Sequence, residues 1–257
     1  MKFQSFGITD TGRVREHNED ALLTNDKLGL FIVADGLGGH NAGEVASRMT
    51  TEVMESFTKK ALSGDEITWP YGPQADLTRE ENIVASSILL ANREVADCAA
   101  SEPEHMGMAT TVVSLLIHEG EKSTDAIIGN VGDSRIYRLR GSEFEQISED
   151  HSLVGEQYRA GLLTREQMDT HPQRNIITRA VGSRDELEVD IFSVEIEKGD
   201  LFLLCSDGLN GELSDAAMCQ ILLDNDGSLK KAGKALVDAA LEAGGRDNVT
   251  IVLVKAS

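Results

Sequence analysis

The sequence contains few cysteines, few basic residues and no long apolar run. Its three cysteines form no CxxC pair, and an odd number in a chain of 257 residues does not indicate a disulfide framework. We therefore expect buried thiols at Cys98, Cys205 and Cys219. No apolar run approaches the roughly 20 residues that span a bilayer, and the start, MKFQSFGITD, lacks the basic segment and apolar core of a signal peptide. These absences predict a cytoplasmic protein without membrane insertion.

Acidic residues outnumber basic ones, with 44 Asp and Glu against 24 Lys and Arg, a formal net charge of -20 and a pI near 4.6. Such a chain repels nucleic-acid backbones and anionic lipid surfaces, so a nucleic-acid partner is not expected. Hydrophobic residues make up 40% of the sequence, which is enough for a substantial core. No internal repeat, low-complexity tract or linker divides the chain, and we expect one domain over residues 1–257.

The apolar pattern predicts strands at both ends of the chain and helices between them. Alternating or apolar runs indicate strands in FQSFGIT, ALLT, LGLFIVAD, LFLLCSD and VTIVLV. Helical spacing covers residues 42–60, 78–101, about 214–223 and about 228–242, and Thr78 with Glu81 forms a capping-box pattern. TTVVSLLIH, DAIIGNVGD, RIYRLR and FEQIS follow one another closely, which favours antiparallel meanders. We expect an α+β fold of antiparallel sheet covered by helices.

The segment SGDEITWPYGPQADL, residues 63–77, concentrates Gly, Pro and the only tryptophan between two predicted helices. We interpret it as a loop. A packed connector is the simpler interpretation, and a docking loop is the alternative.

Four aspartates lie at the edges of apolar strands: Asp35, Asp133 and Asp207 end their runs, and Asp247 precedes VTIVLV. One such residue is ordinarily a turn or cap residue. Four carboxylates gathered at one core would raise one another's pKa unless cations neutralised them. Because the candidate ligands are all oxygen atoms, the pattern predicts Mg²⁺ or Mn²⁺ rather than Zn²⁺.

Two further stretches carry polar residues near these strands. RVREHNEDA holds Arg15, Glu19 and Asp20, and a guanidinium beside metal ions suits an anionic substrate. The alternative is a surface salt bridge from Arg15 to Glu19 or Asp20. DGLGGHNAGEVAS, residues 35–47, is compatible with a simple glycine-rich turn when taken alone.

The motifs NED, DGLGGHNAGEVAS, GMATTVV, GNVGDSRIYRLR, EDHSLV, NIITRAVG, CSDGL and GGRDNVT occur in this order along nearly the whole chain. Together they closely resemble the metal-dependent protein phosphatases of the protein phosphatase 2C type, especially bacterial ones. The resemblance implies a four-layer sandwich of two antiparallel β-sheets flanked by helices. Ala109 stands where the family usually has a glycine, and the residues after SDGL are also atypical. Neither departure removes a ligand.

The resemblance also implies a role for individual residues. Asp35 would bridge two Mn²⁺ or Mg²⁺ ions, and Gly36 would offer its carbonyl to one of them. Asp207 and Asp247 would be ligands of the other ion, and Glu19 and Asp20 would hold metal-bound waters. Asp133 with Asp207 would bind a third ion. Arg15, rather than Arg13, would bind the phosphate. His40 would be the general acid, the alternative being a loop histidine that caps the helix near Ala42. Asp35, Arg15 and His40 are thus the catalytic candidates.

By this resemblance the protein hydrolyses phosphoserine and phosphothreonine monoesters in one step through a metal-activated water. It would act on phosphorylated proteins in signalling, as a monomer, and oppose a bacterial Ser/Thr kinase. Residues 151–182 correspond to the variable flap beside the site, so the substrate does not carry over. A catalytically silent phosphoprotein-binding module and a small-molecule phosphatase are the alternatives. A nucleotide-binding P-loop is disfavoured because no GK[ST] follows the glycines.

Overall fold

The computed structural model describes residues 1–38, 42–64, 68–183 and 186–257, and they form two antiparallel sheets. The first has the order β1-β11-β10-β7-β8, with the bounds Phe3–Asp10, Val249–Ala256, Leu201–Cys205, Arg135–Arg140 and Glu143–Gln146. The second has the order β2-β3-β5-β6-β9, with the bounds Asp20–Asn25, Leu30–Leu37, Val112–Glu119, Thr124–Val131 and Asp190–Glu195. The short β4, Ala109–Thr110, pairs with β3. The predicted antiparallel pairing is confirmed for β5-β6 and for β7-β8, but β6 and β7 lie in different sheets, so the four strands form two hairpins.

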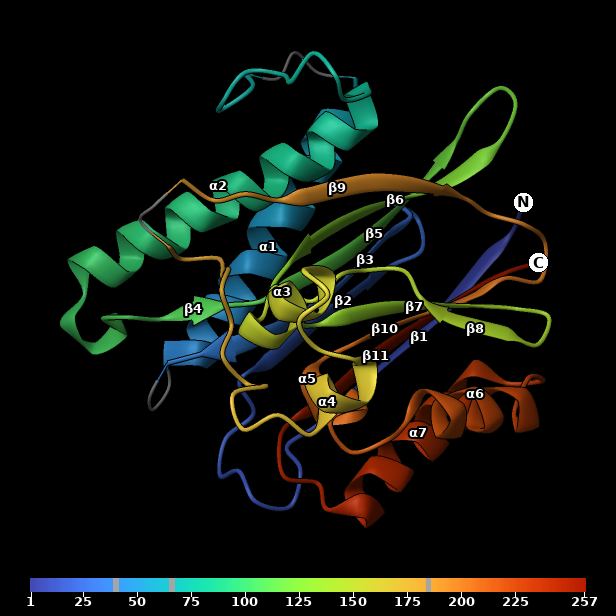
Figure 1. The fold of residues 1–257 in the computed structure, drawn as a ribbon. Coiled ribbons are helices and arrows are strands. Elements are labelled where there is room, and N and C mark those ends of the chain that lie inside the picture. Colours follow the sequence, from blue (N-terminus) through green and yellow to red (C-terminus); the bar gives the residue numbers. More distant parts are fainter. Residues whose placement is uncertain (39–41, 65–67, 184–185) are drawn as a thin grey trace.

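Helices cover the outer face of each sheet (Figure 1). The second sheet packs against α1, Ala42–Leu62, and α2, Arg79–Ser101, and the first packs against α6, Asp215–Asp224, and α7, Leu229–Ala243. The layers are therefore helix, sheet, sheet and helix, which confirms the predicted α+β sandwich. One domain over residues 1–257 stays a prediction.

Alternation along the strands explains the layers. In β3, Phe31 and Val33 pack between the two sheets, whereas Leu30 and Ile32 pack under the helices. Successive side chains of a strand point to opposite faces, so a strand buried on both sides must be apolar throughout. This is why LGLFIVA is a continuous apolar run.

The long helices lie close to their predicted positions. The predicted capping box at α2 is present: the Glu81 amide donates to Thr78 Oγ1 at 3.2 Å, and the Thr78 amide donates to Glu81 Oε2 at 2.8 Å. The sequence interpretation missed the strands β4 and β9. It also missed four short helices: α3 (Leu153–Arg159), α4 (Arg165–Asp169), α5 (Asp207–Asn210) and η1 (Pro103–His105). These helices are too short for apolar periodicity to be visible.

The described part of the 63–77 loop packs on the helices. Trp69 lies edge-on to Phe57 with ring centroids 6.4 Å apart, and Tyr71 donates to the Leu89 carbonyl at 3.2 Å. These contacts fit the packed connector better than an open docking loop.

All three cysteines are free. Cys205 is buried as predicted, but the prediction of burial is wrong for Cys98 and Cys219, which are partly exposed. Within the residues that the structure describes, no helix has the length and apolarity that crossing a bilayer requires.

Candidate metal centre

The predicted carboxylates meet at one end of the two sheets. Asp35 of β3 lies directly opposite Asp20 of β2 in the strand register. The first sheet contributes Asp207, which follows β10, and Asp247, which precedes β11, while Asp133 follows β6. A cavity of about 410 Å³ opens there, and its walls include Arg15, Glu19, Asp35, Gly36, Asp133, Asp207 and Asp247.

The backbone of Asp35 is held by the two threonines of the GMATT motif. The Thr111 amide and Thr110 Oγ1 each donate to the Asp35 carbonyl at 2.8 Å, and the Asp35 amide donates to Thr111 Oγ1 at 3.2 Å. These bonds fix the position at which β3 presents its carboxylate. The sequence interpretation gave no role to either threonine.

Gly36 lies where no side chain fits. A Cβ atom there would be 2.2 Å from the Gly43 carbonyl oxygen and 2.5 Å from that of Glu19. Contacts this short displace backbone, so even alanine would push β3 away from α1 or from the segment before β2. Glycine at this position therefore allows the loop of Glu19, β3 and the start of α1 to meet beside the carboxylates.

Two buried carboxylate oxygens have no partner among the described residues. Ser206 Oγ donates to Asp20 Oδ2 at 2.8 Å, but Asp20 Oδ1 and Glu19 Oε1 accept no hydrogen bond. An unpaired buried acceptor is costly unless a bound group satisfies it. Hard divalent cations with their waters supply that partner, so the residues present fit the predicted Mn²⁺ or Mg²⁺ centre.

The described residues do not balance the charges of the cluster. Loss of solvation and the neighbouring carboxylates raise the pKa of Asp20 to about 7 and that of Asp133 to about 8. The same two causes raise the pKa of Asp35 well above its usual value and also raise that of Asp207. Carboxylates in this arrangement need added positive charge to be ionised together at neutral pH.

The metal-free protein is expected to lose stability as the pH rises from about 5.5 to about 8.5. The pKa values of Asp20 and Asp133 are raised in the fold, so the stability present while these acids are neutral is lost as they ionise. We expect the midpoint of thermal unfolding to fall by at least about 4 °C, which corresponds to a loss of ~1–2 kcal/mol in the free energy of unfolding for a chain of this size. Calorimetry in the presence of a chelator measures it.

Saturating Mn²⁺ provides the control for this pH series. It should raise the midpoint most at the alkaline end and remove most of the pH dependence. A midpoint of the chelated protein that is flat or rises over this interval would show that the carboxylates are not crowded as described.

Arg15 pairs with Asp247, which the sequence interpretation considered as a metal ligand but not as a partner of Arg15. Its Nη2 donates to Asp247 Oδ2 at 2.7 Å, so the alternative of a bridge to Glu19 or Asp20 is not what the structure has. Both side chains remain partly exposed, and both line the cavity. The guanidinium thus lies at the mouth of the site with donors that an anion can reach.

Asn248 is a positioning residue that the sequence interpretation missed. Its Oδ1 accepts from the Glu19 amide at 2.8 Å, and its Nδ2 donates to the carbonyls of Thr11 and His17 at 2.8 and 3.0 Å. These bonds join the segment before β2 to the start of β11. The asparagine after Asp247 in GGRDN was the available signal.

A second cavity of about 570 Å³ adjoins the first and shares Asp133, Asn175 and Asp207 with it. Its other walls come from residues 150–175 and from residues 210–214 with Arg246. Part of the predicted flap, residues 151–182, therefore borders the site.

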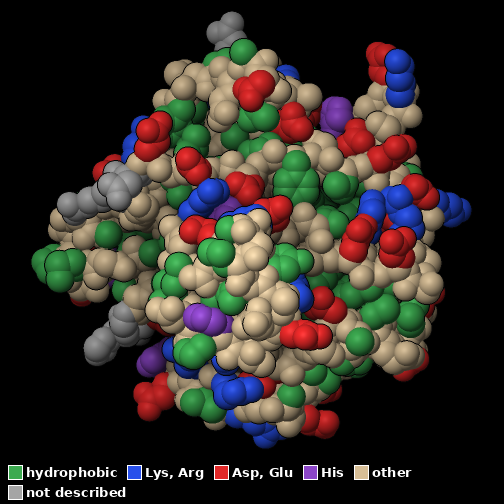
Figure 2. Space-filling model, in the orientation of Figure 1, with side chains coloured by type: hydrophobic (Ala, Val, Ile, Leu, Met, Phe, Trp, Pro, Cys, Tyr) green, Lys and Arg blue, Asp and Glu red, His purple; other side chains and the backbone are tan. Residues whose placement is uncertain are grey.

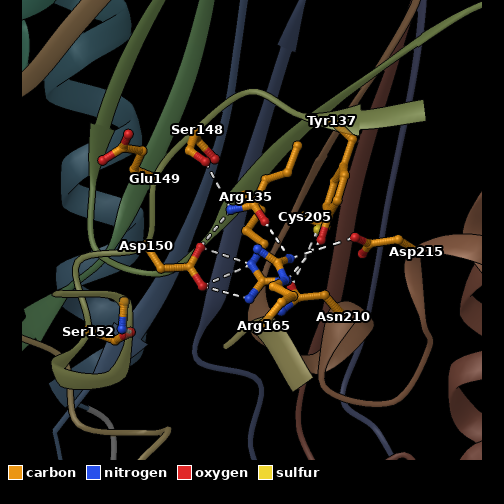
Figure 3. A network of polar contacts seen from close by, with 12 residues as sticks. Arg135, Tyr137, Ser148, Glu149, Asp150, Ser152, Arg165, Cys205, Asn210 and Asp215 are labelled. Carbon is orange, nitrogen blue, oxygen red and sulfur yellow. Dashed lines mark hydrogen bonds and ion pairs between the residues drawn. The ribbon is translucent and has the colours of Figure 1, made fainter. Parts of the chain in front are cut away.

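The buried ion pair of Arg135 and Asp150 forms part of the wall of this second cavity, the groove beside the flap (Figure 3). Arg135 donates to both carboxylate oxygens of Asp150, with Nη2 2.6 Å from Oδ2, and its Nη1 donates to the Tyr137 hydroxyl at 3.0 Å. Arg165 of α4 donates from Nη2 to Gln146 Oε1 at 2.8 Å, and the same nitrogen lies 3.6 Å from Asp215 Oδ2 at the start of α6. These pairs hold the flap helix α4 against the body of the protein beside the groove.

His40 lies outside the described residues. The last described residues before it, Leu37 and Gly38, line the metal cavity, and α1 begins at Ala42. The role of His40 as general acid stays a prediction.

Comparisons with known proteins agree with one another. The sequence profile described as "Protein phosphatase 2C" matches residues 11–243. The serine/threonine phosphatase stp of Listeria innocua is 37% identical over 254 residues, which cover 96% of this chain and 93% of that protein. The crystal structure of the serine/threonine phosphatase Stp1 from Staphylococcus aureus has a TM-score of 0.85 and 33% identity, covering 100% of this chain and 96% of that one. The catalytic domain of the serine/threonine protein phosphatase PstP, solved in complex with two manganese ions, has a TM-score of 0.79 and 31% identity, covering 98% and 97%.

Proposed function

Because the chain belongs to the protein phosphatase 2C family and is a metal-dependent serine/threonine protein phosphatase, we propose which of its residues hold the metal ions, bind phosphate and transfer protons. The observation that carries the proposal is the group of carboxylates with raised pKa values and two unpartnered buried oxygens, Asp20 Oδ1 and Glu19 Oε1. This group needs cations, and its donors are all oxygen atoms.

We assign two ions to the core of the site. Asp35 would hold both ions and the Gly36 carbonyl would hold one of them. Asp207 and Asp247 would complete the set of ligands, and Glu19 and Asp20 would hold the waters of the ions. Asp133 and Asp207 would hold a third ion. The two manganese ions of the PstP structure support this number for the core, and Mg²⁺ suits the same oxygen ligands. When bound, the ions make a water nucleophilic at neutral pH and offset negative charge on the phosphoryl group.

Arg15 binds the phosphate, and His40 protonates the leaving oxygen. Asp247 holds the Arg15 guanidinium at the cavity. A phosphate that enters the cavity presents two oxygens that can accept hydrogen bonds from this planar guanidinium. His40 gives its proton to the seryl or threonyl oxygen as the ester bond breaks, because an alkoxide is a poor leaving group.

Replacing Arg15 by alanine is expected to lower kcat/KM for a phosphopeptide by about tenfold to 10²-fold, equal to about 1.5 to 3 kcal/mol. The physical reason is that one charged, two-pronged contact with the substrate is lost, while the ion ligands remain. Steady-state kinetics with a phosphothreonine peptide measures the loss, and calorimetric titration with Mn²⁺ measures the tight sites.

Arg13→Ala is the matched control, because Arg13 is two residues away and its Nε donates to the Leu241 carbonyl at 2.8 Å rather than to a carboxylate. It should change kcat/KM by less than about twofold. If Arg15→Ala loses its tight Mn²⁺ sites and keeps the KM of the parent, Arg15 only supports Asp247. If the parent enzyme has a higher kcat/KM for sugar phosphates than for the phosphopeptide, the proposal of a protein substrate is wrong.

We also propose the setting in which the phosphatase acts. Its substrates are phosphoproteins made by a partner Ser/Thr kinase, and the groove beside the flap binds the polypeptide around the phosphorylated residue. Three free cysteines suit a reducing cytoplasm. Figure 2 shows acidic and basic side chains interspersed over one face of the molecule. The formal net charge of -20 makes copies of the chain repel one another, which fits a monomer.

A further inference from the structure

A cysteine, a glutamate and a histidine meet at the C-terminal end of α2, away from the carboxylate centre. Cys98 lies in the last turn of α2, Glu102 is its C-cap residue, and His105 ends η1. Their ligand atoms all lie within 4.8 Å of one another. We propose that Cys98, Glu102 and His105 form a second metal site, for a borderline ion of the Zn²⁺ class.

The distances suit a tetrahedral ion. Cys98 Sγ is 3.6 Å from His105 Nδ1, and the same nitrogen is 2.9 Å from Glu102 Oε2. With ordinary zinc bond lengths, the tetrahedral sulfur-to-nitrogen edge is about 3.6 Å and the nitrogen-to-oxygen edge about 3.4 Å. Sulfur and nitrogen already have the required separation. The Glu102 carboxylate must move away from the imidazole by about half an ångström, and its half-exposed side chain has room to do so.

The backbone brings the three side chains to one side. The helix ends at Ser101, and the Glu102 amide still donates to the Cys98 carbonyl at 3.1 Å. The His105 amide then donates to the Glu102 carbonyl at 2.9 Å in the 3-10 turn. The spacing CxxxExxH thus stays on one face across the helix end, as i, i+4 and i+7 do in a helix.

The local charge favours a cation. Carbonyl groups at a helix C-terminus carry partial negative charge, and the last turn of α2 contains no basic residue that would offset it. The thiol is partly buried against the core, and a thiolate with an imidazole and a carboxylate is a donor set that selects Zn²⁺ over Mg²⁺. Three protein ligands leave the fourth position for water.

An ion bound at this site would affect the segment that leads into β4. Three residues after His105, Met108 is almost fully buried, and β4 begins at Ala109. In β4, Ala109 and Thr110 pair with Leu37 and Gly36 of β3. An ion that ties His105 to α2 would therefore fix the segment that leads into the strand beside the carboxylate centre.

Cobalt titration tests the site, because Co²⁺ bound to a thiolate gives a near-ultraviolet charge-transfer band that carboxylate ligands do not give. The enzyme is first saturated with Mg²⁺, so that the carboxylate centre is occupied, and Co²⁺ is then added. We expect the band to saturate with one equivalent, to disappear when one equivalent of Zn²⁺ is added, and to persist when more Mg²⁺ is added. Its apparent affinity should rise with pH, since binding releases the thiol proton.

Three variants make the test specific. Cys98→Ser should abolish the band, and Glu102→Gln should weaken Co²⁺ binding by at least about tenfold, the lower end of what changes around a metal site cost. Cys219→Ser, which changes the other partly exposed cysteine, should leave the band unchanged. Mn²⁺-dependent phosphatase activity should stay at the parent level in all three. Absence of the band in the parent, its survival in Cys98→Ser, or its loss in Cys219→Ser would overturn the proposal without affecting the proposed function.

Discussion

Asp35→Asn is expected to lower phosphopeptide hydrolysis by at least about 10³-fold, which corresponds to about 4 kcal/mol of transition-state stabilisation. Asp35 is the carboxylate that the others surround: Asp20 lies opposite it in the strand register, and burial together with Asp20, Asp207 and Asp133 raises its pKa. An amide has no negative charge to hold two ions, so both should weaken together. Kinetics at saturating Mn²⁺, with calorimetric metal titration, measures activity and occupancy.

Two further variants separate loss of the centre from loss of the fold. Asp133→Asn should keep both tight sites and slow turnover only. Asp125→Asn, at the opposite end of β6 where Ser123 donates to Asp125 Oδ2 at 2.9 Å, should behave as the parent. Metal-free Asp35→Asn should be at least as stable as the metal-free parent, because one of the crowded buried carboxyl groups is replaced by a group that does not ionise. Equal loss of tight sites in Asp35→Asn and Asp133→Asn would contradict the bridging assignment.

His40→Ala is expected to slow phosphopeptide hydrolysis by about 10² or more and p-nitrophenyl phosphate hydrolysis much less. A serine alkoxide needs a proton in the transition state, whereas p-nitrophenolate is stable without one. The comparison of the two substrates therefore isolates proton transfer from binding. Single-turnover measurements at saturating Mn²⁺ make chemistry the observed step for both.

The alternative for His40 is a cap on α1, and it predicts a different pattern. Loss of a cap lowers the unfolding midpoint and slows both substrates by the same factor, because the start of α1 adjoins Gly36. Loss of a general acid, by contrast, leaves the midpoint of thermal unfolding and the number of bound Mn²⁺ ions unchanged. Equal slowing of the two substrates would remove His40 from the chemistry and leave it a role in the loop.

Local sequence patterns determined much of the fold. The run LGLFIVA predicted a strand, and the structure shows that Phe31 and Ile32 of this strand pack on opposite sides of their sheet. Thr78 and Glu81 predicted the start of α2, and both capping bonds are present. Such patterns succeed because burial, strand alternation and capping depend on residues within a few positions of one another. The short helices were missed because their stability comes from contacts with the rest of the protein.

The sequence by itself also predicted which carboxylates would lie together, since each ends or precedes an apolar strand and the ordered motifs resemble one family. Only the tertiary structure decided how they are held. Arg15 pairs with Asp247, 232 positions away in the chain. The backbone of Asp35 is fixed by Thr110 of β4 and by Thr111, the residue that follows it. Cys98, expected to be a buried thiol, faces His105 where the chain leaves α2. Each of these pairings depends on strand register and helix ends that bring distant atoms within hydrogen-bond reach, and no local pattern encodes those distances.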